Sequence, residues 1–152
     1  IRSIGLRFFN VYGPGQSVKD AYASVIPIFI DRMIKKRKII INGGYQTRDF
    51  IYIKDVVNIL IKSMSTIQIK HNHKIFNLGT GKSIKINYLF KTIKKLTNSN
   101  PKFAKKKLDK FDPKKSSGTF KEISKFLKLH KYKFTKLHVG LRQTINYFKT
   151  IN

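Results

Sequence analysis

The 152-residue chain has no cysteine, few acidic residues and no long apolar run. Without cysteine it can form neither a disulfide scaffold nor a thiolate metal site, and nothing indicates an oxidising compartment. Its apolar runs, such as residues 25–30, are far shorter than the roughly 20 residues that span a bilayer. No secretory leader pattern opens the sequence. We therefore expect a soluble, cytoplasmic protein that contacts no membrane.

Length and composition fit one domain, because 41% apolar residues can fill a core. Residue 1 is Ile rather than Met, so we expect the chain to be a piece of a longer protein.

The charge is strongly one-sided, with 33 Lys and Arg against 7 Asp and Glu and a formal net charge of +26. Such an excess is typical of nucleic-acid or anionic-membrane binding, since cations neutralise phosphates. A/T-rich codons offer another explanation, because Lys, Ile, Asn, Phe and Tyr dominate the chain. Lysine also far outnumbers arginine, whereas specific phosphate and base recognition favours arginine. We therefore favour codon bias over a nucleic-acid partner.

Apolar patterning predicts strands separated by helices, which is an α/β arrangement. Expected strands cover residues 4–10, 39–41, 50–53 and 74–78, and expected helices cover 25–34, 55–64, 88–96, 120–129 and 137–148. Asp55 should cap its helix, whose apolar side would carry Val56, Val57, Leu60, Ile61 and Met64. Residues 101–118 begin a Lys-rich stretch with breakers at Pro101 and Pro113, so we expect this segment to be mobile.

Four motifs, in order and spacing, resemble those of one family. They are residues 6–14 (LRFFNVYGP), 21–27 (AYASVIP), 46–57 (QTRDFIYIKDVV) and 76–81 (FNLGTG). Together they resemble the extended short-chain dehydrogenase/reductases, the NAD-dependent epimerases and dehydratases, and especially bacterial UDP-N-acetylglucosamine and UDP-glucose 4-epimerases. Gly140-Leu141-Arg142 with Tyr147-Phe148 is similar to the closing helix of that family.

The resemblance implies that residues 1–152 are the C-terminal, nucleotide-sugar-binding half of a Rossmann-type enzyme whose N-terminal NAD-binding half is missing. The complete enzyme would use NAD, act on a UDP-sugar in sugar-nucleotide or surface-polysaccharide metabolism, and form a homodimer. This piece alone would be inactive. The open alternatives are a 4,6-dehydratase or other family member, a non-functional gene remnant, and a basic nucleic-acid-binding module.

By the same resemblance, Arg48 grips the UDP diphosphate and Asn10 binds the nucleotide sugar. An arginine suits this role, because its planar fork can bond two phosphate oxygens and stays charged. Arg48 could instead be a surface residue paired with Asp49, and Asn10 could merely satisfy a turn.

Weaker assignments follow from the same likeness. Ser24 and Val25 would meet the uracil through their backbone, and Ile40 and Asn42 would flank the ribose and base, although plain strand packing explains the last two equally well. Phe9 would lie near the nicotinamide, but a lone aromatic on an apolar strand is more often core.

The chain also departs from the family pattern. Lys114, beside Asp112, replaces a second phosphate-gripping arginine and loses the bidentate fork. A Ser-x-x-Glu capping box is replaced by residues 85–88 (KINY), which removes both reciprocal helix-start bonds.

No catalytic residue is assigned, because the Tyr-x-x-x-Lys pair of the family is expected in the missing half. Tyr132 and Lys136 match that spacing, which we attribute to chance in a Lys-rich chain. The loop at 79–81 is no dinucleotide loop, since Ile84 stands at the third glycine position. His71 and His73 lack a third ligand nearby, so no metal site is expected.

Overall fold

The computed structural model describes residues 3–19, 23–66 and 73–151. The strands are β1 (Ser3–Phe8), β2 (Asn10–Tyr12), β3 (Ile39–Asn42), β4 (Thr47–Tyr52), β5 (His73–Leu78), β6 (Ser83–Lys85) and β7 (Phe103–Lys106). The helices are α1 (Val25–Ile34), α2 (Ile53–Thr66), α3 (Ile86–Thr97), α4 (Lys121–Phe126) and α5 (Leu137–Thr150). The expected α/β alternation is confirmed; β6 and β7 were not predicted, and the single strand expected at 4–10 is divided into β1 and β2, which pair with different strands.

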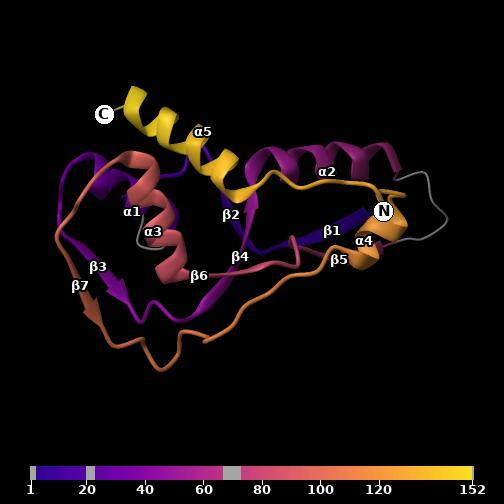
Figure 1. The fold of residues 1–152 in the computed structure, drawn as a ribbon. Coiled ribbons are helices and arrows are strands. Elements are labelled where there is room, and N and C mark those ends of the chain that lie inside the picture. The colour runs from indigo at the N-terminus through magenta and orange to yellow at the C-terminus, as the bar shows by residue number, and fades with distance from the viewer. Residues whose placement is uncertain (1–2, 20–22, 67–72, 152) are drawn as a thin grey trace.

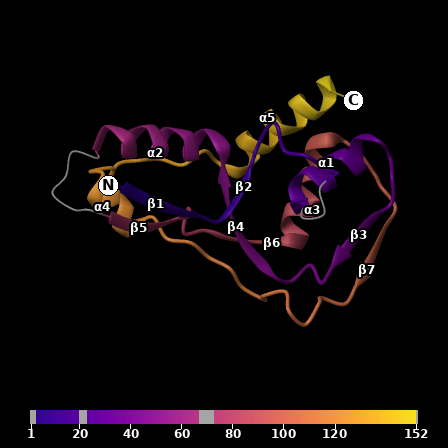
Figure 2. The same cartoon turned by 180° about the vertical axis from the view of Figure 1, so that it is seen from behind.

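The elements divide into two ends joined by β2 and β4. Figure 1 shows α1, α3, α5, β3 and β7 at one end and β1, β5, α2 and α4 at the other. The opposite view in Figure 2 shows the same division. The strands form short, mostly parallel sheets, in which β1 pairs with β5, β2 with β4, and β3 with β7, while β6 joins β4 antiparallel.

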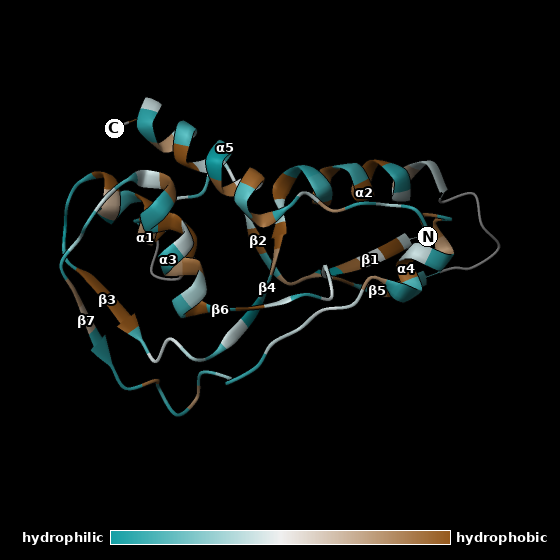
Figure 3. Ribbon diagram, in the orientation of Figure 1, coloured by the Kyte–Doolittle hydropathy of each residue, from teal (hydrophilic) through white to brown (hydrophobic). Residues whose placement is uncertain are grey.

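The first core packs α1, α3 and α5 against β2, β3 and β4. In α1, buried Ile26, Phe29, Ile30 and Met33 recur at helical spacing, and Pro27 is tolerated in the first turn, where its missing N–H has no helical partner. The buried members of this core are Tyr12, Ile26, Phe29, Ile30, Met33, Ile39, Ile41, Phe50, Tyr52, Ile86, Leu89, Phe90, Ile93, Leu141, Ile145 and Phe148. Figure 3 shows β3 as hydrophobic and its neighbour β7 as hydrophilic, which places β7 at the solvent side of this end.

The second core is smaller and lies between α2, α4 and the β1–β5 pair. Its buried members are Ile51, Val56, Ile59, Phe76, Leu78, Ile123 and Leu127. Phe120, Tyr132 and Phe134 pack against this core. Their three rings also contact one another, with centroids 4.8–5.7 Å apart. Ile51 on β4 belongs to this core while Phe50 and Tyr52 belong to the first, because successive strand residues point to opposite faces.

Helix α2 differs from expectation in its start and in its buried face. It begins at Ile53, so Asp55 lies inside the first turn. Val56, Ile59 and Ser63 form the buried stripe, whereas the predicted stripe beyond Val56 is exposed: Val57, Leu60, Ile61 and Met64. Both stripes have helical spacing, so periodicity alone could not choose between them.

Three helices end in a left-handed residue that is not glycine. Lys36, Asn98 and Lys128 have φ of 52°, 49° and 57° and follow α1, α3 and α4. In each case the next amide returns to a carbonyl five residues back, as in the bond from Leu129 N–H to the Ser124 oxygen of 2.8 Å. This turn ends α4 early, so the predicted helix at 120–129 is wrong in its length.

The Lys-rich segment at 101–118 has specific partners along its length. Residues 103–106 form β7 against β3, and residues 114–116 exchange backbone hydrogen bonds with Thr47. Its mobility stays a prediction. Within the described ranges, no helix is long and apolar enough to cross a membrane.

Candidate functional site

A cleft of about 480 Å³ opens between the N-terminus of α1, strand β3 and the start of β4. It gathers most residues that the sequence assigned to the nucleotide sugar, from segments far apart in the chain. Its lining residues are Asn10, Val11, Ala23, Ser24, Val25, Ile28, Phe29, Ile40, Asn42, Gln46, Arg48, Ile86 and Asp112. The fold therefore brings together six of the predicted binding residues: Asn10, Ser24, Val25, Ile40, Asn42 and Arg48.

Arg48 lies in β4 with its side chain 12% exposed, and it pairs with Asp112. Its Nη1 donates to the carbonyl oxygens of Thr47 and Pro113 at 2.8 Å each, and its Nη2 donates to the Asp112 carboxylate. The alternative pairing with Asp49 is therefore wrong. Asp49 lies on the opposite face of the strand, as alternation requires.

Asn10 begins β2, where its Nδ2 donates to the Asp49 carbonyl oxygen at 3.1 Å. This bond crosses the β2–β4 pair, in which Asn10 is in register with Phe50. Asn10 thus has a structural role and still lines the cleft. Ser24 is the N-cap of α1 and makes no side-chain cap bond, and Val25 is the first helical residue. The first amides of α1 consequently point toward the cleft end of the helix.

The turn between β3 and β4 is shaped by Gln46, which sequence reasoning did not assign to the site. Gln46 is buried; its Nε2 donates to the Asn42 oxygen at 2.7 Å, and its Oε1 accepts from Gly44 N–H at 2.6 Å. Gly43 and Gly44 have φ of 66° and 100°, which other residues rarely adopt. The sequence could have indicated this role, because Gln46 directly precedes Thr47 and Arg48 within the family-like motif at 46–57.

The same turn replaces the capping box that α3 lacks. Lys85 is the N-cap of α3 and makes no side-chain cap bond. Instead, the Gln46 carbonyl oxygen accepts from Ile86 N–H at 3.1 Å, and the Gly44 oxygen accepts from Asn87 N–H at 2.8 Å. The loss of capping side chains therefore leaves these two amides satisfied.

Two predicted residues lie outside the cleft lining. Lys114 contributes its carbonyl oxygen to Thr47 N–H at 3.0 Å, while Asp112, two residues earlier, reaches the cleft. Phe9 is half-buried and packs its ring against Gly118, where an added Cβ would lie 2.7 Å from the ring. The motif residues Ala21 and Tyr22 lie outside the described residues.

Asp49 organises the loop that follows β5. Its carboxylate is fully buried and accepts from Thr80 N–H (3.1 Å), Thr80 Oγ1 (2.5 Å), Gly81 N–H (2.8 Å) and Gly118 N–H (3.0 Å). The amides of Thr80 and Gly81 are thus occupied by a side chain of this chain. For that reason the 79–81 loop does not fit a dinucleotide phosphate.

Tyr132 has an environment opposite to that of a tyrosinate base. Its hydroxyl donates to Asp55 at 2.8 Å, and Asp55 also accepts from Thr135 N–H at 3.0 Å. Burial and this hydrogen bond raise the pKa of Tyr132 to about 12, so the phenol holds its proton at neutral pH.

Within residues 3–19, 23–66 and 73–151, no group of three candidate metal ligands occurs. His73 Nδ1 lies 2.6 Å from Ser3 Oγ, and His71 is outside the described residues.

Comparison with known proteins now decides the family. The NAD dependent epimerase/dehydratase family matches residues 1–79, which is more than half of the chain. The chain belongs to this family. The extended short-chain dehydrogenase/reductase likeness and the α/β fold class are thereby confirmed, and solved family members superpose on nearly the whole chain.

Two solved structures illustrate the likeness. UDP-glucose 4-epimerase from Thermotoga maritima, solved with UDP-glucose, has 31% identity and a TM-score of 0.84 over 97% of this chain and 46% of its own. UDP-N-acetylglucosamine 4-epimerase from Methanobrevibacter ruminantium, solved with UDP-N-acetylmuramic acid, has 32% identity and a TM-score of 0.85 over 98% of this chain and 46% of its own.

A curated relative with a different reaction is similar to the same extent. UDP-N-acetyl-alpha-D-glucosaminuronate decarboxylase of Bacillus cytotoxicus is 31% identical over 157 residues, covering 96% of this chain and 46% of that protein. The chain spans less than half the length of the curated relatives that it matches.

Proposed function

We propose that this chain is the nucleotide-sugar-binding half of an NAD-dependent UDP-sugar 4-epimerase of the UDP-N-acetylglucosamine or UDP-glucose type. The observation that carries the proposal is the cleft, where Arg48, Asn10 and the N-terminus of α1 meet. An arginine suits a diphosphate, whereas the backbone of Ser24 and Val25 beside a neutral, partly apolar wall suits a uracil. The relatives solved with UDP-sugars support the same ligand class.

The chemistry of the complete enzyme would reside outside these residues. NAD would be held by an N-terminal half, and the proton-transfer pair would lie there too, so this chain alone turns over no substrate. Residues 1–152 would bind and orient the UDP-sugar. The complete enzyme would be a cytoplasmic homodimer, and an N-terminal half could also cover the exposed stripe of α2.

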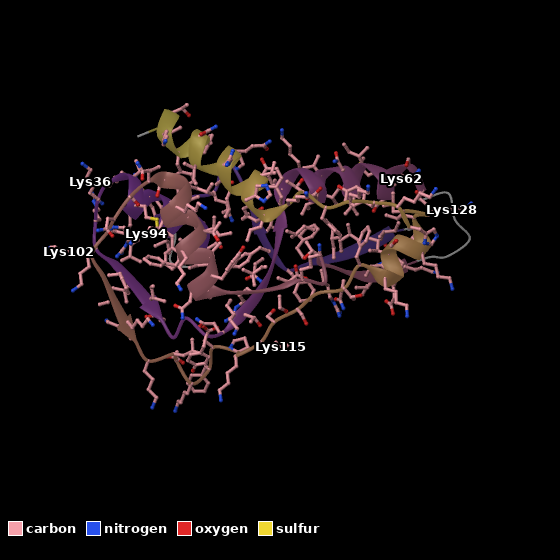
Figure 4. All side chains as sticks on the ribbon, viewed as in Figure 1. Lys36, Lys62, Lys94, Lys102, Lys115 and Lys128 are labelled. Carbon is pink, nitrogen blue, oxygen red and sulfur yellow. The ribbon has the colours of Figure 1, made fainter. Side chains whose placement is uncertain are left out.

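A general affinity for nucleic acid is less well supported. Figure 4 shows labelled lysines at both ends and along the lower edge: Lys36, Lys94 and Lys102, then Lys62 and Lys128, then Lys115. Such a distribution follows composition rather than one continuous face.

The proposal is tested by calorimetric titration of the chain with UDP. Arg48→Ala should weaken binding by about 2 kcal/mol, or about thirtyfold, because a charge-assisted phosphate contact is lost. Arg142→Ala, at an exposed position of α5, is the matched control for lost charge and should bind like the wild type. Equal affinity in the wild type and Arg48→Ala would contradict the assignment.

A further inference from the structure

The cleft is electrically unlike the rest of the molecule. The whole chain has 33 basic and 7 acidic residues. The cleft lining, in contrast, contains one cation, Arg48, and one anion, Asp112, and the two are paired. A second cavity, at the ends of α1, α3 and α5, is basic like the chain as a whole. Its lining includes Lys36, Lys38, Lys102 and Lys149 and no acidic residue.

The arginine fork is already engaged by its own chain. Of the five N–H groups of a guanidinium, three donate to partners in the chain: both on Nη1 to carbonyl oxygens and one on Nη2 to Asp112. Two of these three partners, the Pro113 oxygen and the Asp112 carboxylate, belong to one short segment. A phosphate that approaches Arg48 therefore finds the Asp112 carboxylate already bound to the guanidinium.

The segment that carries Asp112 is positioned by backbone bonds on both sides. Before it, Asp109 accepts from Phe111 N–H through Oδ1 at 2.8 Å and from Asp112 N–H through its carbonyl oxygen at 3.1 Å. After it, Thr47 N–H donates to the Lys114 oxygen at 3.0 Å, and Ser116 N–H donates to the Thr47 oxygen at 3.1 Å. Because Thr47 precedes Arg48, the same strand that presents the arginine also holds the segment with the competing carboxylate.

From this arrangement we propose that Asp112 is a specificity-determining residue that lowers the affinity of the cleft for diphosphates. The proposal rests on the proposed function, since it assumes that a UDP-sugar enters this cleft. A diphosphate must either displace the carboxylate from Arg48 or bind beside it, and both routes cost free energy, because like charges repel strongly where water is partly excluded. The penalty rises with ligand charge, so it is largest for a diphosphate and absent for an uncharged nucleoside.

The test is calorimetric titration of the intact chain with UDP, UMP and uridine at fixed moderate salt. Asp112→Asn keeps the side-chain size and removes the charge; it should tighten UDP about tenfold, tighten UMP less and leave uridine unchanged. Asp112→Ser is a second variant that should act in the same direction. Asp112 is 38% exposed, so neither change opens a buried cavity.

Matched controls separate a local effect from general basicity. Asp109→Asn removes a negative charge from the same segment outside the cleft lining but keeps an Oδ1 that can accept from Phe111 N–H, and Lys102→Gln removes a cation from the lysine-lined cavity. Both should leave the ratio of UDP to uridine affinity unchanged. A rise in that ratio for Asp109→Asn as large as for Asp112→Asn would overturn the proposal.

The outcomes also separate this inference from the proposed function. If Arg48→Ala weakens UDP binding but Asp112→Asn binds UDP no better than the wild type, the cleft binds nucleotide and the inference about Asp112 is wrong. If UDP binds no better than uridine in every variant, the diphosphate site itself is wrong, and the inference fails with it.

Discussion

The two cores differ in how completely they bury their apolar residues. The first core packs α1, α3 and α5 against β2, β3 and β4, and it supports the cleft; among the described residues it buries sixteen apolar side chains, against seven in the second core. Each end contains a two-stranded parallel sheet, β3–β7 at the first and β1–β5 at the second, although parallel strands are normally covered on both faces. Among large apolar side chains, the largest exposed fractions on the described helix and strands of the second end are those of Ile61 and Met64 on α2, at 60% and 71%, while Phe8 and Ile75 on its sheet are 46% and 48% exposed.

This difference shows which part of the molecule is more completely packed. The cleft rests on the larger of the two cores. The second core leaves apolar side chains of β1, β5 and α2 exposed. Strand β4 links the two ends, because Phe50 and Tyr52 pack into the first core and Ile51 into the second.

The largest effect among variants that still fold is expected at Asp49, which ties the second core to β4. Asp49→Ala should lower the free energy of unfolding by about 3 kcal/mol or more, because the amides of Thr80, Gly81 and Gly118 lose a buried charged acceptor. Urea denaturation followed by circular dichroism would measure it. Glu122→Ala, at an exposed position of α4, should change stability by no more than about 0.5 kcal/mol. A similar small change in both variants would show that the carboxylate is not a linking element.

A smaller effect is expected inside the first core, at Gly140 of α5. Glycine to alanine normally stabilises a helix by about 0.5–1 kcal/mol. Here an added Cβ would overlap the Tyr12 hydroxyl and lie 3.0 Å from the Tyr52 ring, and both rings are buried. Overpacking costs about 1–3 kcal/mol, so Gly140→Ala should lower the melting temperature. A raised melting temperature would mean that this core is looser than its packing indicates.

High pH should weaken the packing beside the second core through Tyr132. Burial and the hydrogen bond to Asp55 raise the pKa of Tyr132 to about 12, against about 10 in an unfolded chain. As the pH rises, the folded state therefore keeps this proton longer than the unfolded state does. The contribution of Tyr132 to the free energy of unfolding is complete below pH 10 and is lost between pH 10 and about 12.

Tyr132→Phe isolates that contribution. Urea midpoints measured from pH 8 to pH 11 should fall less steeply in the variant than in the wild type. The urea midpoint of the variant should still fall with pH, because burial also raises the pKa of Tyr12 and of Tyr52. Identical slopes in the two proteins would contradict the role assigned to Tyr132.

The sequence predicted the elements of the first core well because local signals agreed with tertiary burial. Helix α1 has one apolar stripe and an early proline, and its bounds matched the expected 25–34. Strands were expected at 39–41 and 50–53 on either side of the glycine turn; β3 agrees, whereas β4 begins three residues earlier than expected, at Thr47. The family likeness placed Arg48, Asn10 and the start of α1, and these residues do meet in one cleft.

Other features depend on contacts that no local pattern encodes. Strand β7 (FAKK) is a strand only because β3 pairs with it, and α4 ends early at Phe126, followed by the left-handed Lys128 with no glycine to signal the end. Asp112 enters the cleft in place of Lys114 because Thr47 fixes the register of that segment. On α2, two stripes had the same period, and tertiary packing buried the one that had not been predicted.

The variants with the smallest expected effect test the difference between the buried and the exposed stripe of α2. Ile61→Lys and Met64→Lys place charge on the exposed stripe of α2, where each side chain is already mostly in water. Each should change the free energy of unfolding by no more than about 0.5 kcal/mol, the usual scale for a surface site. Ile59→Lys, on the buried stripe of the same helix, is the matched control and should prevent folding, since its side chain is fully buried and a lysine there would be unpaired. If Met64→Lys were as damaging as Ile59→Lys, the exposed stripe would be covered in the isolated chain, and the contrast between the two cores would not hold.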